Sequence, residues 1–305
     1  MKFIKKDKIF EWLSPNSWWK SHTMAPSAIY WKGKIRVFIG AWDENPISRI
    51  TYIDLDPLDP RKVLKVKDDS PILDIGKKGM FDDNGVFPAH ANVIDNRIHL
   101  FYTGFQTGKN VPHFNFGGLA ISEDGENFRR VSHAPILDRA DEGLLVRAGQ
   151  SVLKEKKNYK IVYSAGSKFT YVGNKLRPHY DIFFQESGDS TNLQKKGFKI
   201  IEANEKVEHG LGRPQLIKIK DKYFIFYTRR KLDMKYFMGA ASSKDLKKWD
   251  TEESLFNEIH HSNEGFDSEM IYFPSVVFIP NNNKHLLFYC GNEFGKTGIG
   301  YCELV

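Results

Sequence analysis

The heptapeptide IHLFYTG, residues 98–104, decides the fold because four other segments of the chain repeat its pattern. The other copies are IRVFIGA (35–41), YKIVYSAG (159–166), YFIFYTRR (223–230) and HLLFYCGN (285–292). Their anchor residues, with the one in IHLFYTG, are Ile39, Tyr102, Tyr163, Tyr227 and Tyr289. Successive anchors are 63, 61, 64 and 62 residues apart. This regular spacing predicts five repeats of one structural unit.

Each copy is flanked by two further apolar runs, which predicts a small antiparallel sheet for each unit. In the second unit the preceding run is FPAHANVI (87–94), a tight DNR turn follows it, and the later run is GGLAISED (117–124). Short runs rich in Val, Ile, Phe and Tyr, bounded by Gly, Asn and Asp, are typical of β-strands.

A fourth, outer strand follows four of the copies, as in RKVLKVKDDSPIL (61–73), but the fifth copy reaches Val305 without one. The strand-like segment KFIKKDKIF (2–10) is therefore expected to pair as the outer strand of the last unit. The predicted fold is all-β: one domain over 1–305, a five-bladed β-propeller of four-stranded antiparallel blades closed by the N-terminal strand. A β-solenoid or two sandwiches are the alternatives.

Charge and composition exclude some classes of function. The net charge of +7 comes from scattered Lys and Arg rather than a basic block, so nucleic acid is not indicated, while an anionic ligand such as a nucleotide-sugar stays open. The N-terminus has no apolar signal region and no run of 18 apolar residues occurs, which predicts a cytoplasmic protein without membrane insertion. Cys290 and Cys302 are expected to be buried free thiols in neighbouring strands.

Residues just before the inner strand of each blade are expected to converge on a central pocket. The inner strands are aligned on Pro26, Pro88, Gly149, Pro214 and Pro274. The alignment selects as candidate site residues His22, Asp82, Asp83, Arg147, Glu208, His209, Arg213, Asp267, Glu269 and Tyr272. Such a set suits a sugar, because carboxylates accept hydrogen bonds from hydroxyls and rings stack on apolar sugar faces.

Three carboxylates are candidates for acid and base chemistry at a glycosidic bond, namely Asp83, Glu208 and Glu269. Asp83 and Glu269 both lie five residues before their aligned proline. Neighbouring side chains of an extended loop point to opposite faces, so Asp83 is expected to reach the pocket while Asp82 ties the turn. The other seven candidates are predicted to bind substrate.

Structural alternatives stand beside these roles. Asp82 could cap a turn, Arg213 could be an ion-pair partner of a carboxylate, and His22 could be a hydrogen-bonded core histidine. The remaining histidines lack metal-ligand spacing and no nucleotide-binding motif occurs in useful context, so no metal and no cofactor is expected.

Six stretches carry a resemblance to a known superfamily: SHTMAP (21–26), GMFDDNGVFP (79–88), GLAISEDGENF (118–128), GRPQL (212–216), GFDSEMIYFPSVV (265–277) and FYCGNEFGKTGIGYCEL (288–304). On these, the chain resembles the five-bladed propeller glycosidases, which include arabinanases, xylosidases, invertases and levansucrases. It resembles more closely the bacterial glycosidase-like proteins of surface-polysaccharide biosynthesis. The resemblance covers nearly the whole chain and implies the propeller fold and a carbohydrate ligand.

The resemblance does not carry over the catalytic residues of those hydrolases. They place a carboxylate from each of the first three blades in the pocket, whereas this sequence offers His22 on the first blade and Arg147 on the third. Three functions therefore stay open: an enzyme that cleaves or transfers a glycosyl unit, a nucleotide-sugar-using transferase or tailoring enzyme with phosphates held by Arg147 and Arg213, and a non-catalytic glycan-binding propeller.

Overall fold

The computed structural model describes residues 1–14 and 17–305, and nearly all of its regular structure is β. The first group of strands is β2 (Ser21–Trp31), β3 (Lys34–Trp42), β4 (Ser48–Leu55) and β5 (Val63–Val66), hydrogen-bonded in that order as an antiparallel sheet. The fourth group has the same form, with β14 (Glu208–Ile219), β15 (Lys222–Lys231), β16 (Phe237–Ser243) and β17 (Asp250–Thr251). A 3-10 helix, η1 (Glu253–Phe256), follows it.

The second and third groups share one eight-stranded sheet, where the sequence predicts two separate sheets. The second group is β6 (Val86–Ile94), β7 (Arg97–Thr107), β8 (His113–Ser122) and β9 (Arg129–Arg130). The third is β10 (Val146–Glu155), β11 (Asn158–Val172), β12 (Lys175–Ser187) and β13 (Phe198–Ile201). Within each group the pairing is antiparallel, but β8 and β10 also pair in parallel over two residue pairs. The loop before β10 runs beside β8, where Asn115 N donates to Leu145 O, and this contact merges the sheets.

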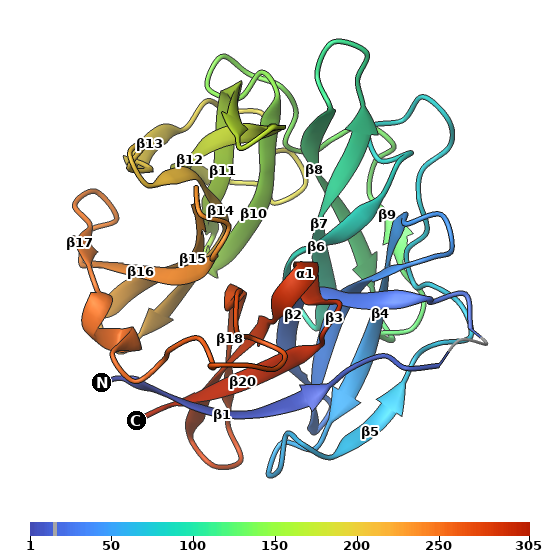
Figure 1. Cartoon of the computed structure of the whole chain (residues 1–305), viewed down its shortest axis with the longest axis vertical. Helices are drawn as coiled ribbons and strands as arrows, with labels where there is room; N and C mark the ends of the chain where they lie inside the picture. The colour runs from blue at the N-terminus through green and yellow to red at the C-terminus, as the bar shows by residue number, and fades with distance from the viewer. Residues whose placement is uncertain (15–16) are drawn as a thin grey trace.

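The last group combines both ends of the chain. Its strands are β18 (Tyr272–Ile279), β19 (Lys284–Cys290), β20 (Ile299–Leu304) and the N-terminal β1 (Phe3–Phe10), with a short helix, α1 (Asn292–Gly295), between β19 and β20. β1 pairs antiparallel with β20, as expected for the segment 2–10, and the two termini lie side by side (Figure 1). Cys290 and Cys302 are free and buried in the paired strands β19 and β20, which confirms that prediction.

The first strand of every group carries the same irregularity. The ladders of β2, β6, β10, β14 and β18 each shift register at the aligned proline or glycine. Four residues there have positive φ: Ala25 (53°), Gly149 (68°), Arg213 (48°) and Phe273 (55°). A β-bulge of this kind redirects the side chains beside it.

A cycle of side chain to backbone hydrogen bonds links these five strands. Just after each bulge, one side chain accepts from a backbone N–H of the next group's first strand, and the last accepts from the first. The acceptors and donors are Ser27 with Ala91, His90 with Val152, Ser151 with Leu216, Gln215 with Val276, and Ser275 with Ala28. The strand groups therefore follow one another around the middle of the molecule (Figure 1).

The core is divided in the same way. Five hydrophobic clusters each combine side chains from two successive groups, and one of them joins the first group to the last. The cluster with Val37, Ile53, Phe288 and Ile299 is that joining cluster. Burial of apolar surface between neighbouring sheets is thus the main force that holds the groups together.

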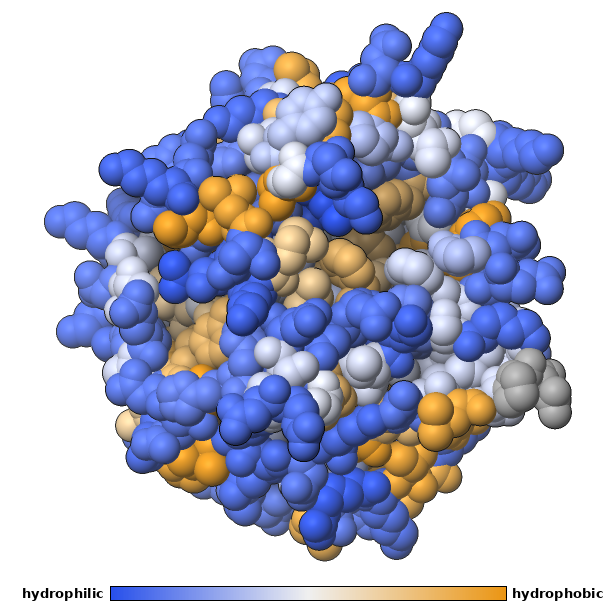
Figure 2. Space-filling model, viewed as in Figure 1, coloured by the Kyte–Doolittle hydropathy of each residue, from blue (hydrophilic) through white to orange (hydrophobic). Residues whose placement is uncertain are grey.

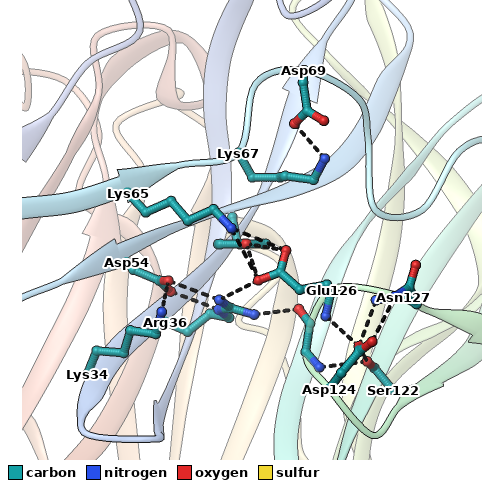
Figure 3. A network of polar contacts seen from close by, with 12 residues as sticks. Lys34, Arg36, Asp54, Lys65, Lys67, Asp69, Ser122, Asp124, Glu126 and Asn127 are labelled. Atoms are coloured by element: carbon teal, nitrogen blue, oxygen red, sulfur yellow. Dashed lines mark hydrogen bonds and ion pairs between the residues drawn. The ribbon is translucent and has the colours of Figure 1, made fainter.

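A polar network fixes the turn SEDGENF against the first group (Figure 3). Arg36, fully buried on β3, donates two hydrogen bonds to Asp54 and lies over the ring of Tyr52, with its Cζ 3.6 Å from the centroid. It also reaches Glu126 of the turn at 3.3 Å. Asp124 closes the turn by accepting from the backbone N–H groups of Glu126 and Asn127. The turn 122–128 thus has a structural role.

Candidate functional site

A pocket of about 410 Å³ lies where the bulged strands converge. Side chains from all five strand groups line it. In the view of Figure 2 the middle of the molecule is hollowed, and pale orange residues lie in the hollow within a largely blue surface. The volume is in the range of pockets that take small ligands.

The lining is aromatic and basic. Its aromatic side chains are Trp42, Phe87, Phe105, Tyr180, Phe273 and Phe294. Its basic side chains are His113, Arg177, Arg213 and Arg230, and its small polar ones are Ser48, Asn84, Thr103, Asn115 and Ser164. Among the residues that the structure describes, no Asp or Glu lines this pocket.

The bulges explain which residues reach the pocket. Phe87, Arg213 and Phe273 each stand directly before an aligned proline, and all three line it. Gly149, at the bulge of β10, also lines the pocket, and a Cβ there would meet the Cα of Arg213 at 3.2 Å. The inner strands on which the sequence was aligned therefore do contribute to the pocket, mainly through the residues at their bulges.

Arg213 is the one predicted site residue in the lining. Its side chain links three strands by hydrogen bonds in the middle of the molecule. Its guanidinium donates to the carbonyl oxygens of Pro88, Phe273 and Pro26, at 3.0, 3.2 and 2.5 Å. These carbonyls belong to β6, β18 and β2 or their immediate ends. Burial lowers the pKa of Arg213 to about 9, so the side chain stays charged at neutral pH.

Asp83, and not Asp82 as expected, closes the turn, and neither carboxylate reaches the pocket. The Asp83 carboxylate accepts from the backbone N–H of Gly79 at 2.8 Å and so closes its own turn. Asp82 is fully buried and accepts from Tyr102 and Arg130. Neither lines the pocket; the loop sends Asn84 and Gly85 there instead.

Asp82 belongs to an arrangement that occurs three times. In each case the tyrosine hydroxyl of the repeat donates to a carboxylate from the preceding loop, and a cation lies beside that carboxylate. The sets are Asp82 with Tyr102 and Arg130, Glu142 with Tyr163 and Arg147, and Asp267 with Tyr289 and Lys5. The hydroxyl–carboxylate distances are 3.1, 3.0 and 2.9 Å. Buried tyrosine hydroxyls need acceptors, so these carboxylates stabilise the packing within the strand groups.

Arg147 and Glu208 are likewise committed to the protein. Arg147 is fully buried and donates to the carbonyls of Asp138 and Lys195 besides its contact with Glu142. Glu208 accepts from Arg229 and from the backbone N–H of Asn204.

Glu269 is exposed, and its backbone N–H donates to Asn292. Asp83, Glu208 and Glu269 are thus not gathered in the pocket. Their catalytic roles stay predictions.

The other three candidates form a layer behind the lining. The His22 ring stacks on the pocket residue Trp42, with centroids 3.7 Å apart. His209 shares a hydrogen bond of 2.8 Å with Tyr236, and its pKa is lowered to about 3 by burial and by Arg230. Tyr272 is fully buried beside Phe273.

Sequence reasoning missed Trp42, Arg177, Tyr180 and Arg230. Arg230 lies three residues after its repeat anchor, and the same position holds Trp42 in the first copy and Phe105 in the second. All three line the pocket, so this shared repeat position was a usable signal. Arg177 and Tyr180 lie on β12, in a hairpin that extends past the repeat pattern. Within the described chain, no group of three His, Cys, Asp or Glu side chains could hold a metal ion, and no helix is long and apolar enough to cross a membrane.

Comparison with known proteins places this fold. No protein-family model matches the sequence. The chain is 28% identical over 307 residues to the "Uncharacterized protein Rv1502" of Mycobacterium tuberculosis (strain ATCC 25618 / H37Rv), covering 100% of this chain and 99% of the relative. It is 26% identical over 192 residues to a 1,2-beta-oligomannan phosphorylase of Thermoanaerobacter sp. (strain X514), covering 61% of this chain and 58% of the relative.

Solved structures match over almost the whole length. A glycoside hydrolase has a TM-score of 0.75 at 16% identity, with 99% of this chain and 92% of that chain covered. A structure from work on the GH130 family of mannoside phosphorylases, which contains glycoside hydrolases that target β-1,2 mannosidic linkages in Candida mannan, has a TM-score of 0.69 at 14% identity and coverage of 99% and 93%. The chain therefore has the fold of the propeller-type glycoside hydrolases.

Proposed function

We propose that the protein is a glycosidase-like, carbohydrate-active protein that binds a glycosyl ligand in the central pocket and cleaves or transfers it. The observation that carries the proposal is the pocket itself, because it lies where the inner strands of a glycoside-hydrolase fold converge. Its aromatic side chains offer flat apolar surfaces and its Ser, Thr and Asn side chains offer hydrogen bonds, which together suit a sugar ring.

The proposal includes the architecture. The five repeats form five blades of one domain over 1–305, and β1 closes the ring beside β20. The cycle of hydrogen bonds through Ser27, His90, Ser151, Gln215 and Ser275 supports five blades, since it returns to β2. The merged sheet of the second and third groups is then a local contact between neighbouring blades.

A non-catalytic glycan-binding propeller is the second candidate. One observation favours it: among the described residues, the pocket has no carboxylate at its wall to act as acid or base. A role in surface-polysaccharide biosynthesis, acting on a nucleotide-sugar, would use the same pocket.

Incubation with oligosaccharides is expected to show binding or turnover that depends on the pocket. The first oligosaccharides to test are β-1,2-linked oligomannosides, with and without inorganic phosphate. They are chosen because one relative is named a 1,2-beta-oligomannan phosphorylase. Phe105→Ala should weaken binding by about tenfold, since it removes an aromatic face from the pocket. Product chromatography separates turnover from binding alone.

Phe278→Ala is the matched control, because this phenylalanine on β18 is 43% exposed and does not line the pocket. Equal binding by Phe105→Ala and the wild type would contradict the pocket as the carbohydrate site.

A further inference from the structure

The pocket gathers arginines that lack a carboxylate. Eight arginines of the described chain are buried or half-buried. Five of them form ion pairs with carboxylates: Arg36, Arg49, Arg130, Arg147 and Arg229. The other three are Arg177, Arg213 and Arg230, and all three line the pocket. Buried charges are normally paired, so this concentration of unpaired arginines needs a cause.

Arg230 shows the contrast within one strand. Its neighbour Arg229 points to the other face of β15 and pairs with Glu208. Arg230 instead donates to the hydroxyl of Tyr180 and lies between two rings, with its Cζ 5.1 Å from the centroid of Tyr180 and 5.5 Å from that of Tyr236. Tyrosine rings hold a guanidinium in place without neutralising it.

Arg177 comes from the extended hairpin. Past the register shift between Ala165 and Lys168, β11 and β12 continue for five residue pairs, and Thr170 lies opposite Arg177. The Nε of Arg177 is buried, and within the residues that the structure describes it has no hydrogen-bond partner. A buried donor without a partner is unusual in a folded protein, and because Arg177 lines the pocket, a bound ligand is a source of the missing acceptor.

The pocket histidine, His113, does not change the positive charge of these arginines. Burial lowers the pKa of His113 to about 4, with Arg230 and Arg177 acting in the same direction. His113, Arg177 and Arg230 all line the same pocket. The imidazole is therefore neutral at pH 7, and the subsite keeps its positive charge from arginine alone.

We infer that Arg177, Arg230 and the Tyr180 hydroxyl form a subsite for the phosphate group of a phosphorylated sugar. Two guanidiniums balance a phosphate dianion, and their N–H groups with the phenol serve its three terminal oxygens. The sugar ring then lies against Phe105 and its neighbours in the pocket. Arg213 also lines the pocket and adds positive charge, although its N–H groups donate to backbone carbonyls. This inference rests on the proposed carbohydrate ligand and specifies its charge.

Calorimetric titration of the whole chain with four probes tests the subsite: mannose 1-phosphate, mannose, glucuronate and inorganic phosphate. Mannose 1-phosphate is expected to bind at least about tenfold more tightly than mannose. Arg177→Gln should lower that affinity by about 10- to 100-fold and have a much smaller effect on mannose binding. Arg177→Lys should fall between, because it keeps the charge and loses the fork of donors. Arg139→Gln is the charge-matched control, since this arginine is exposed over Phe114 and Phe116 outside the pocket.

The outcomes separate this inference from the function on which it rests. Binding of mannose and mannose 1-phosphate with equal affinity would overturn the phosphate subsite and leave the carbohydrate proposal intact. Tight binding of inorganic phosphate alone, with no gain from the sugar, would assign the arginines to free phosphate and overturn the sugar-borne group, while the oligosaccharide panel would still test the carbohydrate proposal. Preference for glucuronate would replace phosphate by a carboxylate. No binding of any probe would overturn the inference.

Discussion

Lowering the pH from 7 to 5 is expected to remove several kcal/mol of folding stability, more than carboxylate titration causes in that range. Burial lowers the pKa of His90 and His209 to about 3 and that of His22, His99 and His113 to about 4, from an ordinary value of 6.5. The unfolded chain takes up these protons below pH 6.5 and the folded chain does not. Stability is therefore complete above about pH 7 and is lost progressively as the pH falls from 6.5 toward 4.

His90 is the histidine that tests this effect most clearly. Its Nδ1 accepts from the backbone N–H of Val152 in the cycle that links the inner strands, so protonation would also break that contact. By linkage, His90 alone costs about 2 kcal/mol between pH 7 and pH 5. Urea unfolding at the two pH values measures the difference. His90→Gln keeps an acceptor but cannot titrate, so its pH-dependent loss should be smaller by about that amount.

The measured quantity is the difference in the free energy of unfolding between pH 7 and pH 5. A destabilisation by the substitution that is equal at both pH values does not change this difference. His133→Gln, at an exposed position, is the matched control and should behave as the wild type. An identical pH-dependent loss in His90→Gln and the wild type would mean that this histidine is not held neutral by the fold.

Arg213→Met is expected to cost about 4 kcal/mol or more at pH 7. The guanidinium joins carbonyls at the inner ends of β2, β6 and β18, and the substitution leaves these buried acceptors without donors. Arg213→Lys should retain part of the stability, because one ammonium cannot span three strands. Urea unfolding followed by tryptophan fluorescence measures both.

Arg139→Met is the control for loss of one positive charge and should shift the midpoint little, because Arg139 is exposed. An unfolding midpoint for Arg213→Met equal to that of the wild type would show that other donors satisfy the carbonyls. Arg213 would then not link the three strands.

The repeat architecture could be predicted because it depends on local patterns that every copy shows. Each copy needs apolar strand residues at a fixed spacing, and the anchors from Ile39 to Tyr289 preserve it. The pairing of β8 with β10 could not be predicted, because it involves only two residue pairs near the beginning of the two strands. Those residues carry no sequence pattern that distinguishes them.

The site was harder to predict because a carboxylate in the sequence can either bind a ligand or accept hydrogen bonds inside the protein. Asp82 and Asp267 were predicted to bind substrate, but in the fold each accepts a hydrogen bond from a buried tyrosine hydroxyl and lies beside a cation. Arg177 gave no signal, since it lies in the hairpin extension that the other units lack. The alignment on prolines did find Arg213, because the bulge itself is encoded locally.

A structure of the protein with bound mannose 1-phosphate tests most directly that the central pocket holds the ligand. The sugar ring is predicted to lie against Phe105, with phosphate oxygens at about 2.8 Å from the guanidinium nitrogens of Arg177 and Arg230. Ligand density outside this pocket, for instance in the surface hollow beside Trp18 and Arg49, with the central pocket free of it, would contradict the account.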